Sequence, residues 1–157
     1  MTERSGRGEE VQAAAKAAFN LGNSLEQAGK TEEARVAWRT AIEQGMASAT
    51  PEGREAAAKA AFHLGISFRK AGKTEEARVA WRTAIEQGTA SATPEGRVVA
   101  AKAAFNLGIR LDSAGKREEA NAAWCTAIEQ GMASATPEGR EAAAKAALHL
   151  GISLDNL

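Results

Sequence analysis

The amino-acid sequence repeats itself with a period of 43 residues. Trp38, Trp81 and Trp124 are spaced by this interval, and so are three Thr-Pro pairs. The segment AGKTEEARVAWRTAIEQG occurs unchanged at 28–45 and at 71–88. A fixed period of this size is typical of a chain built from stacked copies of one supersecondary unit. We therefore divide the chain into a leader (1–7), three repeats (8–50, 51–93 and 94–136) and a half repeat (137–157).

Each repeat is predicted to begin with a helix. Ala, Glu, Lys and Arg are frequent, and these side chains lose little freedom in a helix. In the second repeat, Thr50 is placed to cap this helix, Pro51 suits its first turn, and Gly72 suits a left-handed residue after its end. Aromatic residues make up only 4% of the chain, which disfavours a β-sandwich or barrel.

A second helix is expected in each repeat. In the second repeat it would begin at the N-cap Thr74 and run to Gly88, followed by a linker of five residues. Arg117 stands in the third repeat where the first two have threonine. We therefore expect the second helix of the third repeat to start less firmly.

The apolar residues of each helix recur on one face. Small residues opposite a single tryptophan allow two helices to approach closely. One helix pair cannot bury enough surface alone, so neighbouring repeats must stack to complete the core. In the first repeat the two sets are Ala18, Leu21, Gly22, Leu25 and Ala28, and Ala34, Ala37, Trp38, Ala41 and Ile42.

The string AAFNLGNSLEQAGKTEEARVAWRTAIEQG at 17–45 resembles a tetratricopeptide repeat. This resemblance implies an all-α fold, an α-solenoid of stacked antiparallel helix pairs with three repeats and a terminal helix. The family's usual period is about 34 residues. We expect the additional residues to lengthen the first helix by about two turns. The matching residues in the first repeat are Leu21, Gly22, Leu25, Ala34, Trp38 and Ala41.

The resemblance further implies an inner groove, lined by the first helices, that binds a protein or peptide. The spacing i, i+3, i+7, i+10 puts each set of candidate residues on one helix face. Two interpretations stay open for the Phe and Ile residues: they form the floor of a peptide groove, or they only pack between adjacent first helices. The candidates are Lys16, Phe19, Asn23, Glu26, Lys59, Phe62, Ile66, Arg69, Lys102, Phe105, Ile109 and Asp112, with Lys145, Leu148, Ile152 and Asp155 in the half repeat.

The chain is not expected to be an enzyme or to bind a metal or cofactor. No phosphate loop or nucleophile motif is present. His63 and His149 lie two repeats apart, too far to share a metal, and each replaces an Asn, so we expect polar surface roles. Cys125 replaces an Arg of the other repeats and is expected to be exposed, without a catalytic role, and open to air oxidation to a linked dimer.

The net charge limits the classes of partner that the chain can bind, and the absence of a targeting signal bears on its location. Twenty basic residues balance twenty acidic ones, which argues against nucleic-acid or membrane binding. The first fifteen residues hold no apolar signal-peptide core, and a single cysteine suits a reducing compartment. We therefore expect a cytoplasmic protein.

Two alternatives remain beside a peptide-binding scaffold. The fourth unit ends after its first helix, so Leu148, Leu150 and Leu154 would be exposed, and an end surface resembles an internal one. A structural array that self-associates through its ends, as an oligomer or by helix exchange, is therefore the second hypothesis. The chain could also be a fragment or an engineered version of a longer array.

Overall fold

The computed structural model describes residues 2–156, with side chains from residue 6 onward. Within this range the chain forms helices and no strand, which confirms the predicted all-α solenoid. We call α1, α3, α5 and α7 the A helices and α2, α4 and α6 the B helices. The bounds are α1 (Thr2–Gln27), α2 (Thr31–Ser48), α3 (Pro51–Lys70), α4 (Thr74–Ser91), α5 (Pro94–Ser113), α6 (Arg117–Ala133) and α7 (Pro137–Asp155).

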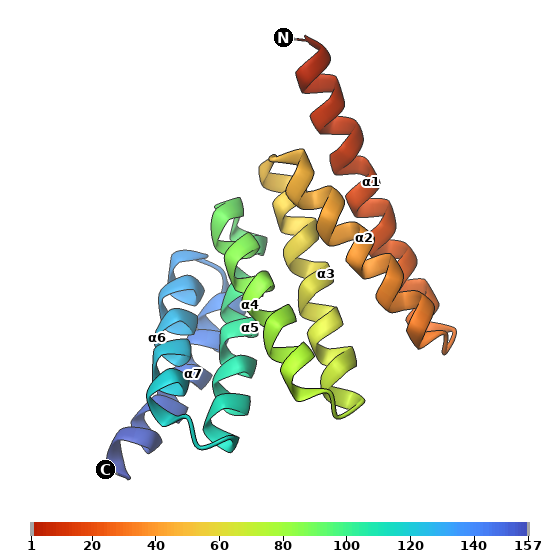
Figure 1. The fold of residues 1–157 in the computed structure, drawn as a ribbon. Coiled ribbons are helices and arrows are strands. Elements are labelled where there is room, and N and C mark those ends of the chain that lie inside the picture. Colours follow the sequence, from red (N-terminus) through yellow and green to blue (C-terminus); the bar gives the residue numbers. More distant parts are fainter. Residues whose placement is uncertain (1, 157) are drawn as a thin grey trace.

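The helices stack in chain order, and the two ends of the chain lie at opposite ends of the array (Figure 1). Every helix packs against the next one along the chain. Each A helix also contacts the following A helix, whereas no B helix packs comparably on another B helix. The A helices therefore form one continuous, inner surface, and the B helices are spread apart on the outer side.

The Thr-Pro starts of α3, α5 and α7 are confirmed as predicted. The Oγ1 atoms of Thr50, Thr93 and Thr136 accept hydrogen bonds from backbone N–H groups three residues on, at 2.9–3.0 Å. In α1, Arg7 and Gly8 take the positions of this pair. No cap or proline interrupts the chain there, and α1 runs back through the leader to Thr2.

The B helices are longer than predicted. The helix expected to end at Gly88 continues to Ser91, and only two residues join it to α5. Ala92 then takes a left-handed conformation, with φ of 57°. Ser91 Oγ donates to the carbonyl of Gly88 at 2.7 Å and accepts from the Thr93 N–H at 3.3 Å. The additional residues of the long period therefore lengthen the B helix as well as the A helix. In the B helix, this serine closes the last turn.

The A-to-B turn confirms one prediction and overturns another. Gly72 is left-handed as expected, with φ of 75°. The N-cap of α4, however, is Lys73, whose side chain makes no cap hydrogen bond, and Thr74 is already the first helical residue. The same holds at Lys116, before Arg117. The predicted threonine caps are thus wrong, and Arg117 removes no cap hydrogen bond.

The three tryptophans form the centre of the core, with only 0–2% of each side chain exposed. Each indole packs directly over a glycine of its own A helix, namely Gly22, Gly65 or Gly108, where even one added carbon would overlap the ring. This confirms the predicted close approach of the two helices. Leu21 was expected in the core but is 54% exposed. Its equivalents in α3 and α5 are buried because a preceding B helix covers them; no described helix covers that side of α1.

Candidate functional site

Clefts run along the inner surface of the A helices. The largest, about 620 Å³, lies among α1, α3, α5 and the start of α7. A neighbouring cleft of about 320 Å³ shares three of its residues, Phe62, Lys102 and Glu138, and extends to Phe105. Two smaller openings lie nearer the C-terminal ends of the A helices, and Ile66 lines both. The surface is therefore hollowed on both sides of the Phe62 ring.

Most predicted groove residues line these clefts. Lys16 and Asp112 are the exceptions: both are exposed and line none of the four. We call the remaining ten the A-helix face. They are Phe19, Asn23, Glu26, Lys59, Phe62, Ile66, Arg69, Lys102, Phe105 and Ile109.

The aromatic residues of this face are half-buried. Phe19, Phe62 and Phe105 each pack against the core with one part of the ring and line a cleft with another. The two interpretations of these residues are therefore compatible, because one ring can join adjacent A helices and still present apolar surface to a ligand.

His63 lies within an aromatic cluster, and its expected role as a polar surface residue is wrong. Its ring is stacked on Trp38, with centroids 5.8 Å apart, and lies 5.4 Å from Phe19 and 5.8 Å from Phe62. Burial, and secondarily the positive charge of Lys102, lower the pKa of His63 below its usual 6.5. The neutral ring therefore serves as an apolar spacer between α1 and α3. His149 lies similarly against Trp124 and Phe105.

Asn23 has an internal partner. Its Oδ1 accepts a hydrogen bond from Trp38 Nε1 at 3.2 Å. Ile66 takes this position in the second repeat, and Trp81 Nε1 is buried without a partner among the described residues. Part of the polar character predicted for the face at Asn23 is therefore used to satisfy the core.

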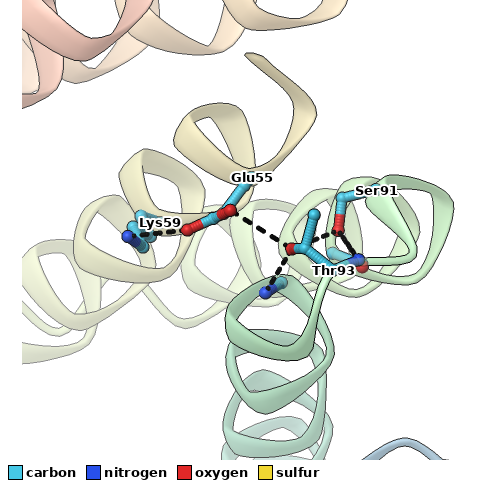
Figure 2. A network of polar contacts seen from close by, with 6 residues as sticks. Glu55, Lys59, Ser91 and Thr93 are labelled. Carbon is cyan, nitrogen blue, oxygen red and sulfur yellow. Dashed lines mark hydrogen bonds and ion pairs between the residues drawn. The ribbon is translucent and has the colours of Figure 1, made fainter. Parts of the chain in front are cut away.

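The lysines of the face differ in their partners. Lys59 Nζ lies 3.0 Å from Glu55 Oε1, and the other carboxylate oxygen accepts from Thr93 Oγ1 at 3.2 Å, which joins α3 to the start of α5 (Figure 2). Lys102 has Val98 in place of that glutamate and makes no ion pair with any described residue. Its exposed ammonium group is thus available at the junction of the two largest clefts of the inner surface.

Sequence reasoning missed several cleft residues. Val98 and Val99 supply apolar wall to the largest cleft, and Glu95 and Glu138 supply carboxylates. A signal existed: the third repeat reads RVVAAK where the second reads REAAAK. The valines replace Glu55 and an alanine, and this change enlarges the apolar surface of one repeat only.

A metal site, a reactive cysteine and a membrane-spanning helix are three other features that could indicate a function. The described residues contain no group of three or more His, Cys, Asp or Glu side chains that could hold a metal ion. Cys125 is exposed, as predicted. No helix between residues 2 and 156 combines the length and apolarity needed to cross a bilayer.

Comparison with known proteins agrees with the helical-pair architecture. A family model described as tetratricopeptide repeat matches residues 16–44 and 59–87, each covering the C-terminal part of an A helix and most of the B helix that follows. No curated protein matches the chain. Repeats of this family generally mediate protein–protein interactions, and proteins built from them are generally non-enzymatic scaffolds. By these two matches and its stacked helix pairs, the chain contains tetratricopeptide repeats at residues 16–44 and 59–87.

Proposed function

We propose that the chain is a non-enzymatic scaffold that binds a peptide segment of another protein on the A-helix face. This proposal rests on the pair of joined clefts on either side of Phe62, with apolar walls from three consecutive A helices. Concave, mostly apolar surfaces with a few polar groups are typical of binding sites. The zero net charge supports a protein partner over a nucleic acid.

The peptide would carry an apolar or aromatic side chain next to a carboxylate. The apolar side chain would lie against Phe62 and Val99, where it would displace water from half-buried rings. The carboxylate would pair with Lys102, whose ammonium group has no internal acceptor among the described residues. The exposed single cysteine supports a reducing compartment such as the cytoplasm for this activity.

The test is selection of a displayed random-peptide library on the immobilised chain. Selected peptides are then measured against two variants by fluorescence anisotropy. Phe62→Ala combined with Lys102→Glu removes one ring and reverses one charge of the A-helix face. The matched control, Val79→Ala with Lys30→Glu, makes comparable changes at exposed positions elsewhere on the molecule.

We expect selected peptides to share an apolar residue beside Asp or Glu, and to bind the first variant at least tenfold more weakly than the control. Circular dichroism spectra of both variants should match that of the parent chain. Failure of any peptide to be enriched, or equal binding to the two variants, would contradict the proposal.

Self-association is the second candidate function. Its support is the exposure of large apolar residues on the terminal helices: Leu21 on α1, and Leu148, Ile152 and Leu154 on α7. Sedimentation velocity across a hundredfold concentration range tests it. A sedimentation coefficient that rises with concentration is expected under this candidate, and a constant monomer value contradicts it.

A further inference from the structure

Helix α7 exposes a face that the other A helices bury. Along this face lie Ala144, Ala147, Gly151 and Leu154, all exposed, with Leu154 at 51%. We call these four residues the α7 face. The corresponding residues of α3 and α5 are all buried; they are Ala58, Ala61, Gly65 and Phe68 in α3, and Ala101, Ala104, Gly108 and Leu111 in α5.

In each of the earlier repeats, this face is covered by the B helix of the same repeat. The tryptophan of that B helix packs over the glycine: Trp38 over Gly22, Trp81 over Gly65, and Trp124 over Gly108. At Gly151, by contrast, no heavy atom from outside its own turn of helix lies within 4 Å of where a Cβ would be. The α7 face therefore continues, by one more repeat, an interface that the chain already forms three times.

The position of α7 is fixed by packing on the opposite side of the helix. Ala142, Ala143, Ala146 and Ser153 are buried, and α7 packs on α6 as α3 does on α2 and α5 on α4. A ligand would thus find the helix already fixed in place, which removes an ordering cost from binding.

The three internal interfaces also specify the ligand. All three B helices bury a tryptophan together with alanines at positions −4, −1 and +3, such as Ala77, Ala80 and Ala84 around Trp81. The alanines let the helix approach closely, and the indole fills the space above the glycine. A helix with this A-x-x-A-W-x-x-A pattern is complementary to the α7 face.

We propose that the α7 face is a docking site for a separate amphipathic helix of this pattern, with its tryptophan seated over Gly151. A second copy of the chain does not supply such a helix in its folded state. The described B helices bury their own tryptophans. The site is distinct from the A-helix face, so the proposal stands or falls separately from the proposed function.

The probe is a fluorescein-labelled synthetic peptide of residues 74–91, TEEARVAWRTAIEQGTAS, added to the full chain. Binding is followed by fluorescence anisotropy. We expect saturable binding that Trp81→Ala in the peptide weakens at least tenfold. In the chain, Gly151→Ala should not lower the melting temperature, because the added methyl group meets nothing. It should nevertheless weaken peptide binding at least tenfold, because the methyl group would overlap the incoming indole.

Lys145→Ala is the matched control in the chain, since Lys145 is an exposed residue of α7 outside the α7 face. It should bind the peptide as the parent does. Binding that is insensitive to Gly151→Ala, or that is lost in Phe62→Ala instead, would overturn the proposal. Concentration-dependent dimers that disappear in Gly151→Leu would also overturn it, because the occupant would then be a second copy.

A fusion protein removes the cost of bimolecular association. Residues 74–91 are joined after Leu157 through a flexible Gly-Ser linker of about fifteen residues. We expect the melting temperature to rise by at least 5 °C, and the rise to vanish when Gly151→Leu is introduced. No rise in this fusion, together with no saturable peptide binding up to about 1 mM, would contradict the inference.

Discussion

The indole of Trp38 is stacked on the imidazole of His63, with ring centroids 5.8 Å apart and planes inclined by 22°. The same indole packs over Gly22. One side chain thus joins the two helices of its own repeat to the first helix of the next repeat. Trp124 and His149 repeat the relationship at 5.5 Å and 24°. Because the indole is shared, neither repeat completes its core without the other.

Substituting the glycine under the indole should show how tight this arrangement is. Gly65→Ala adds a methyl group that overlaps Trp81, so we expect a loss of about 1–3 kcal/mol in the free energy of unfolding. Gly151→Ala is the matched control, because it occupies the same repeat position with open space around it. It should be neutral or stabilising by up to about 1 kcal/mol, since Ala favours helix over Gly. Urea denaturation measures both, and equal effects would contradict the packing.

Stability should depend on pH through His63. Burial and Lys102 lower its pKa in the folded chain, whereas in the unfolded chain it protonates near its usual 6.5. The unfolded state therefore binds more protons below pH 6.5, and stability falls as the pH drops from there toward the lower folded pKa. The charged groups that line the same cleft are Lys59, Lys102, Glu95 and Glu138.

The control for this prediction is His63→Asn, since Asn occupies the same position at Asn20 and Asn106. Thermal melts at about pH 7.5 and about pH 5.0, on either side of the ordinary histidine pKa, should show a larger loss of stability in the parent chain than in the variant. An equal loss would mean that other groups, and not His63, cause the acid sensitivity.

The left-handed alanines between B and A helices offer a stabilising change. Ala92 has φ of 57°, a conformation that costs an L-residue about 1–2 kcal/mol and costs Gly almost nothing. Gly also loses more freedom on folding, so we expect Ala92→Gly to stabilise the chain by about 0.5–1 kcal/mol. Ala90→Gly, an exposed helical position two residues earlier, should destabilise it by about 1 kcal/mol. Chemical denaturation should give opposite signs for the two variants.

An arginine in the middle of the array lacks the partner that its equivalent has. Arg35 Nε donates to Ser67 Oγ at 2.9 Å, across the interface between the first two repeats. At the next interface Arg78 is buried, and its Nε has no partner among the described residues, because Arg110 stands where Ser67 would be. Arg110→Ser should therefore raise the free energy of unfolding by about 1–2 kcal/mol. An exposed control, Arg69→Ser, should change it by less than about 0.5 kcal/mol; a loss of stability in Arg110→Ser would refute this explanation.

The parts of the fold that local chemistry decides could be predicted from the sequence. A Thr-Pro pair such as Thr50 and Pro51 starts a helix, because the threonine side chain bonds to the backbone nearby. Gly72 marks a left-handed residue for a similarly local reason, since its own backbone adopts that conformation easily. Ala92 carried no such signal, since alanine rarely adopts this conformation; the serine and threonine around it hold the turn closed. The start of α4 was predicted one residue too late. Thr74, expected to be the N-cap, is therefore the first residue of the helix.

Properties that depend on a neighbouring repeat could not be read from a single unit. Leu21 and Leu64 share a repeat position, but only Leu64 is buried, because α2 lies against it. His63 replaces an Asn in sequence, yet Trp38 from the preceding repeat makes its environment aromatic. For the candidate site, the helical spacing predicted which residues share a face, whereas the largest cleft depends on Val98 and Val99, which one repeat alone contains.

Solution NMR gives the sharpest test of whether the inner surface of the A helices binds the partner. Spectra of the isotope-labelled chain are recorded with increasing amounts of a peptide selected on it. We predict that the largest chemical-shift changes fall on Phe62, Lys102 and Phe105. Changes confined to the outer B helices, around the exposed Val36 and Val79, with the A helices unaltered, would show that the proposed surface is wrong.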